Sequence, residues 1–420
     1  MTGESAPDDT GHSHEGTPFP RIPKLPRIRK LPRVRKRLRT RRGALAVASA
    51  VAVLAAGLGT WTTDTWPFDE DRDRYCWGAW EQDSGPGVLG DEAFDGADGR
   101  SRTARGTAPT PAEPRGGCVL AVRSQHTFSD GDKGVQDTEV TLTYGPAPRA
   151  AAARVEWITT FLGDRAVPLP EGLPGAVDGR HGLLVLPERC DTRDGRPTAV
   201  TVRAEEKGPR DVIGGKGLGS ADDAVELLLA AANTGMRAAG CAPKEPLRVT
   251  SPLLRLPEQE DTSPSTAACR IQGLDVEAGF AEDTALRVEA QTGAVTDGLQ
   301  ACSARIGRSA LRGEREDTRI FDALMVREPR LSALLDGVTG SAPPARGWRG
   351  TGVFADGHQI VRARCAGRPT TFLLLGSTAR ETRGYFTAFT NGVTRRLGCA
   401  PVAPSATEPV TPSAAEGEHR

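Results

Sequence analysis

The sequence predicts an α+β fold, with a single N-terminal transmembrane helix followed by two tandem, small, disulfide-stapled α+β repeats. Three observations lead to this prediction: an uncharged apolar segment at 43–63, eight cysteines that all follow it, and matching sequence in two sets of four cysteines. Aromatic residues make up only 5% of the chain, and Gly and Pro number 49 and 32. This composition favours small domains with flexible connections and excludes a protein with several membrane spans.

Charge is divided unevenly along a chain whose 54 basic and 54 acidic residues sum to zero. Residues 1–42 contain 12 Lys or Arg and 4 Asp or Glu, so the remainder carries an equal acidic excess. This basic tail repeats a hexapeptide, at 25–30 and 31–36, whose prolines prevent a continuous basic helix. We predict a disordered cytoplasmic tail that attracts anionic lipid or sets membrane topology, and no binding of nucleic acid.

The segment 43–63 is long enough to cross a bilayer, for which about 20 apolar residues are needed. Its preceding flank is basic, and its following flank, the predicted linker 64–75, is acidic. Because basic loops stay in the cytoplasm, we expect a single-pass protein of the cell membrane with its C-terminal part outside. A cleaved signal peptide ending at Val53-Leu54-Ala55 and a twin-arginine signal at Arg41 and Arg42 are the alternatives. The long basic lead-in favours an uncleaved anchor.

Eight cysteines lie after the apolar segment, and their even number on the exported side predicts a disulfide framework. A zinc site would require closely spaced cysteine pairs, and the shortest spacing here is 28 residues. We therefore expect no metal. The cysteines are Cys76, Cys118, Cys190, Cys241, Cys269, Cys302, Cys365 and Cys399.

The second half of each cysteine set has the same sequence features at the same offsets, which predicts a tandem duplication. Each contains a cysteine, a Gly-Arg-Pro-Thr motif, an apolar strand, a helix with a capping box, an Asn, and a Gly-Cys-Ala-Pro end. In the first set these are Cys190, 195–198, 199–204, Ser220 with Asp223, Asn233 and 240–243. In the second they are Cys365, 367–370, 371–375, Thr378 with Glu381, Asn391 and 398–401.

The order of strand and helix in each repeat predicts two disulfides. A helix that folds back antiparallel on the preceding strand brings its end near the start of that strand, which pairs Cys190 with Cys241 and Cys365 with Cys399. The remaining pairs would be Cys76–Cys118 and Cys269–Cys302. Four cysteines allow three pairings in each repeat, so these two pairs stay open.

Local patterns place the other elements and the domain boundaries. We expect strands at 119–123, 139–144, 183–186, 286–290 and 360–363, and helices at 150–161 and 319–335. The first repeat spans 76–243 and includes a Gly/Pro/Ala/Asp-rich insert at 84–117 that we predict to be disordered. A linker at 244–268 leads to the second repeat, 269–402, and 403–420 is a disordered tail.

No motif in the chain predicts catalysis, and we assign no catalytic, cofactor-binding or metal-ligating residue. His181 and His358 occupy matching turns; a duplicated ligand-binding turn is disfavoured against ordinary turn residues beside Asp-Gly. The Gly-rich run 214–219 fails the phosphate-loop pattern, because Arg210 stands at the first Gly position and Gly217 follows the lysine. Trp77 and Trp80 are expected to pack on the disulfide of Cys76, with exposed sugar stacking as the alternative.

The Cys76-Trp-Gly-Ala-Trp80 start, the tandem four-cysteine units and an Arg to Lys ratio of 47 to 7 resemble membrane-anchored, cysteine-rich secreted proteins of high-GC actinobacteria. This resemblance implies an exported, anchored protein and transfers no activity and no functional residues.

A duplicated fold without a duplicated reactive group favours a non-enzymatic binding or scaffolding protein of the cell envelope, with an envelope protein or glycan as ligand. One alternative is an envelope hydrolase acting on cell-wall glycan or peptide, which would need two carboxylates in a cleft. A second alternative is a single-pass sensor that signals to the basic tail.

Overall fold

The structure, a computed structural model, describes residues 73–94, 97–127, 133–207, 217–256, 265–276, 286–308, 318–376 and 379–404. The predicted cytoplasmic tail 1–42, the apolar segment 43–63 and all but the last residues of the linker 64–75 lie outside these ranges. So does the tail 403–420, apart from its first two residues. In the described ranges, no helix is both long enough and apolar enough to cross a membrane.

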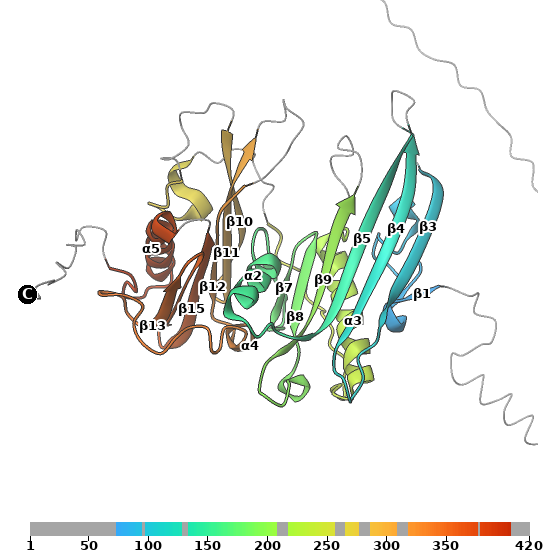
Figure 1. Cartoon of the computed structure of the whole chain (residues 1–420), viewed down its shortest axis with the longest axis horizontal. Coiled ribbons are helices and arrows are strands. Elements are labelled where there is room, and N and C mark those ends of the chain that lie inside the picture. The colour runs from blue at the N-terminus through green and yellow to red at the C-terminus, as the bar shows by residue number, and fades with distance from the viewer. Residues whose placement is uncertain are drawn as a thin grey trace, which may run out of the picture. The chain divides into compact units, whose positions relative to one another are not determined.

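The described chain is mostly β-sheet, so the predicted fold class, α+β with a transmembrane helix, is wrong. One antiparallel sheet has seven strands, a second has six and a third has two. The strands of the two large sheets run to 14 residues, whereas only four α-helices are described in these ranges (Figure 1). The helices pack on the faces of the sheets. They do not alternate along the chain with short strands, as the predicted α+β repeats would require.

The first half of the described chain, residues 73–256, contains the seven-stranded sheet. Its elements are β1 Arg74–Tyr75, η1 Cys76–Gly78, β2 Trp80–Glu81, η2 Asp91–Phe94, β3 Ala97–Thr107, β4 Gly116–Thr127, β5 Lys133–Pro146, α2 Ala151–Leu162, β6 Val167–Pro168, β7 Gly175–Val177, β8 His181–Val185, η3 Glu188–Cys190, β9 Thr198–Lys207 and α3 Ala221–Ala239.

The second half, residues 265–404, contains the six-stranded sheet. Its elements are η4 Ser265–Arg270, β10 Leu286–Val295, β11 Leu299–Arg308, β12 Thr318–Val326, α4 Pro329–Ala333, β13 Thr351–Ala355, β14 His358–Cys365, β15 Arg368–Gly376 and α5 Ala379–Arg396.

The six strands of the second large sheet follow the same order as six strands of the first, which has β6 as an additional edge strand. The first is β3-β4-β5-β9-β8-β7-β6 and the second is β10-β11-β12-β15-β14-β13. In both, three consecutive strands form a meander, a helix follows, and the chain returns through a hairpin to a strand that pairs with the third meander strand. A long helix, α3 or α5, comes last. This shared order is what a duplicated chain would give.

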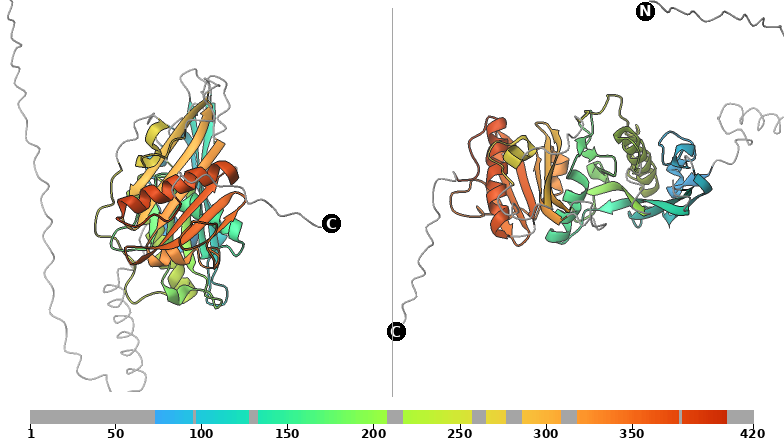
Figure 2. Two further views of the ribbon diagram at one scale, coloured as in Figure 1. Left: turned by 90° about the vertical axis from the view of Figure 1, so that its left-hand side faces the viewer. Right: turned by 90° about the horizontal axis from the view of Figure 1, so that it is seen from above.

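The described core consists of three apolar clusters. One lies between α3 and the first sheet, and a second lies between α5 and the second sheet. The third surrounds α2 and contains side chains from both halves, including Leu183 and Val185 of β8 and Leu324 and Leu373 of β12 and β15. Figure 2 shows α5 and α2 on opposite sides of the second sheet. The two halves therefore share a layer of core.

Four disulfides are present, which confirms the predicted disulfide framework. They join Cys76 to Cys118, Cys190 to Cys241, Cys269 to Cys302 and Cys365 to Cys399, with Cα–Cα distances of 5.3 to 5.5 Å. The second and fourth are the pairs that the fold-back argument predicts. The first cysteine of each set has a positive φ, 48° at Cys76 and 60° at Cys269, so both N-terminal bridges begin in a left-handed turn.

Two predicted features of the terminal helices are confirmed by their hydrogen bonds. The helix α3 begins at a capping box in which Ser220 and Asp223 satisfy each other's backbone N–H groups, and it ends at left-handed Gly240. Its Asn233 binds the backbone N–H and C=O of Leu247, at 2.8 Å each. Asn391 of α5 binds the same two groups of Ala403. Thr378 lies outside the described residues.

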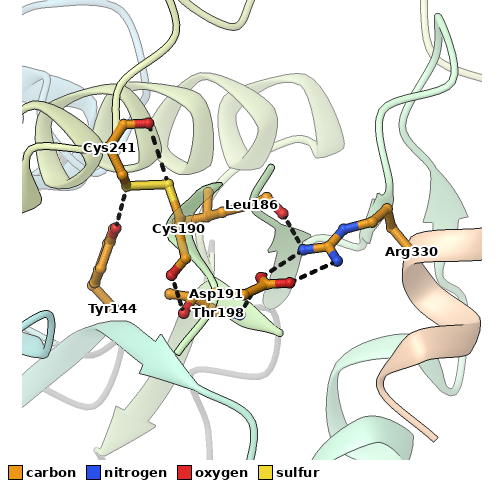
Figure 3. The surroundings of a disulfide bond; sticks show 7 residues. All are labelled: Tyr144, Leu186, Cys190, Asp191, Thr198, Cys241 and Arg330. Atoms are coloured by element: carbon orange, nitrogen blue, oxygen red, sulfur yellow. Dashed lines mark hydrogen bonds and ion pairs between the residues drawn. A yellow bond between two sulfur atoms is a disulfide. The ribbon is translucent and has the colours of Figure 1, made fainter. Parts of the chain in front are cut away.

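Polar contacts at the ends of the strands also join the halves. The guanidinium of Arg330, at the start of α4, binds both carboxylate oxygens of Asp191 at 2.7 and 2.9 Å and donates to the carbonyl of Leu186 (Figure 3). Asp191 follows Cys190, so this contact lies beside the Cys190–Cys241 disulfide. Arg154 of α2 donates to the carbonyl of Asp336 at 2.8 Å.

Two predicted segments are wrong. The insert 84–117 is not disordered where it is described: it contains η2, β3 and the start of β4, and β3 pairs with β4 from Ala97 to Thr107. The predicted helix 319–335 is strand β12 followed by the short helix α4. Because β12 lies between two apolar clusters, it is buried on both faces and lacks the alternation that marks a strand.

The linker 244–268 is anchored to the first half where it is described. The carboxylate of Glu171 accepts hydrogen bonds from the N–H and hydroxyl groups of Thr250 and Ser251, at 2.6 to 3.0 Å. These four bonds lower the pKa of Glu171 to about 2. Together with Asn233, Glu171 fixes the chain that leaves α3.

We predict that Asn233→Ala lowers the free energy of unfolding by about 1–3 kcal/mol, because Leu247 loses the partners of both its backbone groups. The measurement is denaturant unfolding of the oxidised chain. Arg237→Ala on the same helix removes only an exposed contact with Thr234 and should change stability by less than about 0.5 kcal/mol. Equal effects of the two substitutions would contradict the role of Asn233.

Candidate binding face

The face of the first sheet that points away from α3 is covered only in part. The helix α2 packs on β7 and β8, and Leu183 of β8 and Thr201 of the neighbouring strand β9 are buried. Farther along the sheet, the outward side chains are exposed or half-buried. We call these side chains the open face. They are Ser101, Thr103, Arg105 and Thr107 of β3; Val119, Ala121 and Arg123 of β4; Asp137, Glu139, Thr141 and Thr143 of β5; and Arg203 and Glu205 of β9.

The open face is rich in hydroxyl and charged groups and contains no aromatic side chain. Two of its arginines are already paired. Arg123 binds Asp137 through two hydrogen bonds, at 2.7 and 2.9 Å, and Arg203 lies 2.8 Å from Glu205. Such exposed pairs contribute little to stability.

A hollow of about 480 Å³ lies at the end of the open face, where the chain bends between β3 and β4. Its wall is a turn in which the N–H of Glu113 donates to the hydroxyl of Thr110 at 3.0 Å. The turn packs tightly, because a Cβ at Gly116 would lie 2.6 Å from Pro109. The lining includes Thr107, Thr110, Glu113, Arg115, Thr143 and Gly145.

The opposite face of the same strands is covered by α3 at β5 and β9 and by η1 and η2 at β3 and β4. The ring of Tyr144 packs against Gly235, where a Cβ would come within 2.5 Å of it, and its hydroxyl lies 3.3 Å from the sulfur of Cys241. Burial raises the pKa of Tyr144 to about 12. The disulfide to Cys118 fixes β4 in the same way. The open face therefore lies on a stiff support.

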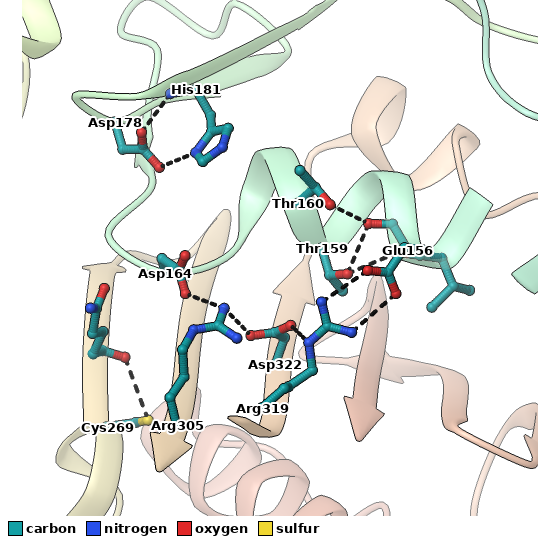
Figure 4. Close-up of polar contacts among 12 residues, drawn as sticks. Glu156, Thr159, Thr160, Asp164, Asp178, His181, Cys269, Arg305, Arg319 and Asp322 are labelled. Atoms are coloured by element: carbon teal, nitrogen blue, oxygen red, sulfur yellow. Dashed lines mark hydrogen bonds and ion pairs between the residues drawn. The ribbon is translucent and has the colours of Figure 1, made fainter. Parts of the chain in front are cut away.

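A second polar cluster, which we call the junction cluster, joins the halves and lies beside α2 (Figure 4). Arg305 of β11 lies 2.9 Å from Asp164 and 3.0 Å from Asp322. Arg319 of β12 lies 2.8 Å from Asp322, without the alignment of a hydrogen bond, and binds Glu156 at 2.9 and 3.1 Å. Two carboxylates of the first half thus share two guanidiniums with one carboxylate of the second.

Asp322 is the buried member of the junction cluster, with a side chain that is 4% exposed. Burial raises its pKa to about 6, and the two arginines lower it only in part. The register places Ser303, Asp322, Leu375 and His358 in one row across the sheet. Burial also lowers the pKa of His358.

The two histidines that the sequence pairs are not brought together as one site. His181 lies 3.2 Å from Asp178 through Nδ1, and its ring makes an edge contact with Phe161. His358 is buried at the start of β14 in the other sheet. Neither lines the hollow. In the described chain, no group of three or more His, Cys, Asp or Glu could hold a metal ion.

The Gly-rich run and the two tryptophans, which the sequence also singles out, make structural contacts. Of the Gly-rich run, the described residues Gly217 and Leu218 bind Glu206 and the turn at Gly179. Trp80 is buried and donates to the carbonyl of Leu227, whereas half-buried Trp77 donates to Gly117. Sequence reasoning did not identify the open face. Its alternating threonines and arginines form no recognisable motif, and only the register of the strands brings them together.

A comparison of the chain with family models, with curated proteins and with solved structures finds no match in any of the three.

We predict that Asp322→Asn changes the pH dependence of stability. Because the pKa of folded Asp322 lies above its ordinary value of 3.8, this group favours folding most below about pH 4 and loses that contribution as the pH rises through 6. The difference corresponds to about 3 kcal/mol. Relative to the Asn variant, the unsubstituted protein should therefore lose about that much unfolding free energy between pH 4 and pH 7. Parallel curves from denaturant unfolding at each pH would show that the pKa of Asp322 is not raised.

Proposed function

We propose that this chain is a non-enzymatic binding module of the cell envelope that holds a protein ligand on the open face. The observation that carries the proposal is that the open face is broad, polar and rigidly supported. Other described elements leave it uncovered, although α2 and the second half cover the adjoining strands. Antiparallel sheets commonly present one face to solvent, so the open face alone is an ordinary feature. The hollow at its end adds a concave anchor point.

The composition of the open face favours a polypeptide over a glycan. Protein sites for sugars commonly stack them on aromatic rings, and the open face has none. Hydroxyl groups and mixed charges instead suit the backbone and polar side chains of a polypeptide.

The proposed location is the outer side of the cell membrane. Four disulfides in the described chain are typical of an oxidising compartment outside the cytoplasm. The basic residues before position 43 and the acidic excess after it favour an orientation in which the C-terminal part lies outside the membrane.

A hydrolase is less well supported than a binding module. Glu139 and Glu205 lie opposite each other on neighbouring strands, which is the carboxylate pair that a glycosidase would need. However, neither residue lines the hollow, and Glu205 is held by Arg203. The carboxylates of the junction cluster are likewise engaged by arginines.

We predict that Thr141→Trp abolishes retention of an envelope protein by the immobilised full-length chain, because a large ring at the centre of the open face blocks close approach. Retained protein is identified by mass spectrometry and then titrated directly against each variant. Thr387→Trp, on the outer side of α5, makes the same substitution in the second half and should leave binding unchanged. Both variants must keep the original thermal midpoint. Equal binding by Thr141→Trp would show that the ligand does not use the open face.

A further inference from the structure

The hollow contains hydrogen-bond donors that nothing in the described chain satisfies. Within the described ranges, the guanidinium of Arg115 and the hydroxyls of Thr107 and Thr143 have no hydrogen-bond or ion-pair partner. Arg105, two residues from Thr107 on the same strand, is likewise unpaired there. The other arginines of the open face, Arg123 and Arg203, are paired with carboxylates. Both unpaired arginines therefore lie at the end of the face that carries the hollow, which Glu113 also lines.

The position of Arg115 is fixed by its surroundings. Its backbone N–H donates to the carbonyl of Glu113 at 2.8 Å, within the turn that forms the wall of the hollow. Its aliphatic stem lies over Gly145, where an added Cβ would be 3.7 Å from the Cγ of Arg115. A glycine at this position leaves room for the stem on the sheet surface. The backbone and the first part of the stem of this exposed arginine are thus placed at the hollow, which Arg115 lines without an acidic partner in the described chain.

One guanidinium beside two hydroxyl donors is a set that recognises an oxyanion. The planar fork of arginine matches a carboxylate through two parallel hydrogen bonds. Glu113 also lines the hollow, and its negative charge opposes a phosphate dianion more strongly than a monoanionic carboxylate. The lining therefore favours a carboxylate.

We propose that the hollow binds a side-chain carboxylate of an acidic segment of the polypeptide ligand, with Arg115 as the principal contact and Thr107 and Thr143 as further donors. This inference rests on the proposed function, since it assigns the ligand's chemistry at one end of the open face. The ligand segment would then extend from the hollow across Thr141 toward Arg105.

The test is calorimetric titration of the full-length chain at low ionic strength with an acetylated, amidated triglutamate peptide. The triglutamine peptide and inorganic phosphate are the comparison probes. We expect the acidic peptide to bind more tightly than either. Arg115→Gln should weaken its binding about tenfold or more, which is the effect of losing a charge-assisted hydrogen-bonded pair. Glu113→Gln should strengthen its binding, because it removes the opposing charge.

Arg395→Gln supplies the matched control, since it removes an exposed arginine from α5 in the other half. It should leave the affinity unchanged. Equal weakening by Arg115→Gln and Arg395→Gln would show that only overall charge matters and would overturn the proposal. So would equal affinity for the two peptides, or tighter binding of phosphate.

The two proposals fail separately. If Thr141→Trp abolishes binding of the envelope ligand and Arg115→Gln leaves its affinity unchanged, the open face is the binding surface and the carboxylate site is wrong. If neither substitution affects the envelope ligand, the proposed function is wrong.

Discussion

Burial of α2 between the two sheets is the constraint on which the rest of the structure depends. Its Val155, Ile158 and Leu162 are at most 1% exposed, and their neighbours come from strands of both halves. The apolar side chains that each sheet contributes to this cluster are covered by α2 and by side chains of the other half. The described residues from 73 to 404 accordingly belong to one compact unit and not to two separable repeats. The arginine contacts at Asp191 and in the junction cluster surround this apolar layer and fix the register of one half on the other.

The open face follows from the same packing. A helix of 12 residues is about 18 Å long, and α2 lies on the short strands β7 and β8. The sheet continues through β9, β5, β4 and β3, where no partner layer covers the outward side chains in the described chain. These positions carry Thr, Arg, Glu and Asp, as a solvated sheet face requires. The inward positions on β4 and β5, such as Leu120 and Leu142, are fully buried in the apolar cluster to which α3 also contributes.

Sequence patterns predicted the features that depend on local chemistry. The capping box of α3, the strand motifs and two disulfide pairs depend on residues close in the chain or on one simple fold-back. Strand β12 was predicted as a helix because burial on both faces makes Ile320 to Val326 apolar at every position except Asp322, so the segment lacks alternation. Strand β3 was predicted as disordered because its inward positions hold Arg102, Ala104 and Gly106, which give no apolar signal. Pairing with β4 forms this strand, and pairing is a tertiary effect.

The candidate site could not be predicted for a related reason. Its donors come from the end of β3, from the bend before β4 and from β5, and only the register that places Gly117 between Thr107 and Thr143 brings them together. Arg115 has no distinctive neighbours in sequence. In the folded chain, Asp137 and Glu205 form ion pairs with other arginines, whereas Arg115 has no acidic partner among the described residues. A charge left unpaired on a surface where the other arginines of β4 and β9 are paired is visible only in the folded chain. In this protein, that difference is the observation on which the proposed carboxylate site rests.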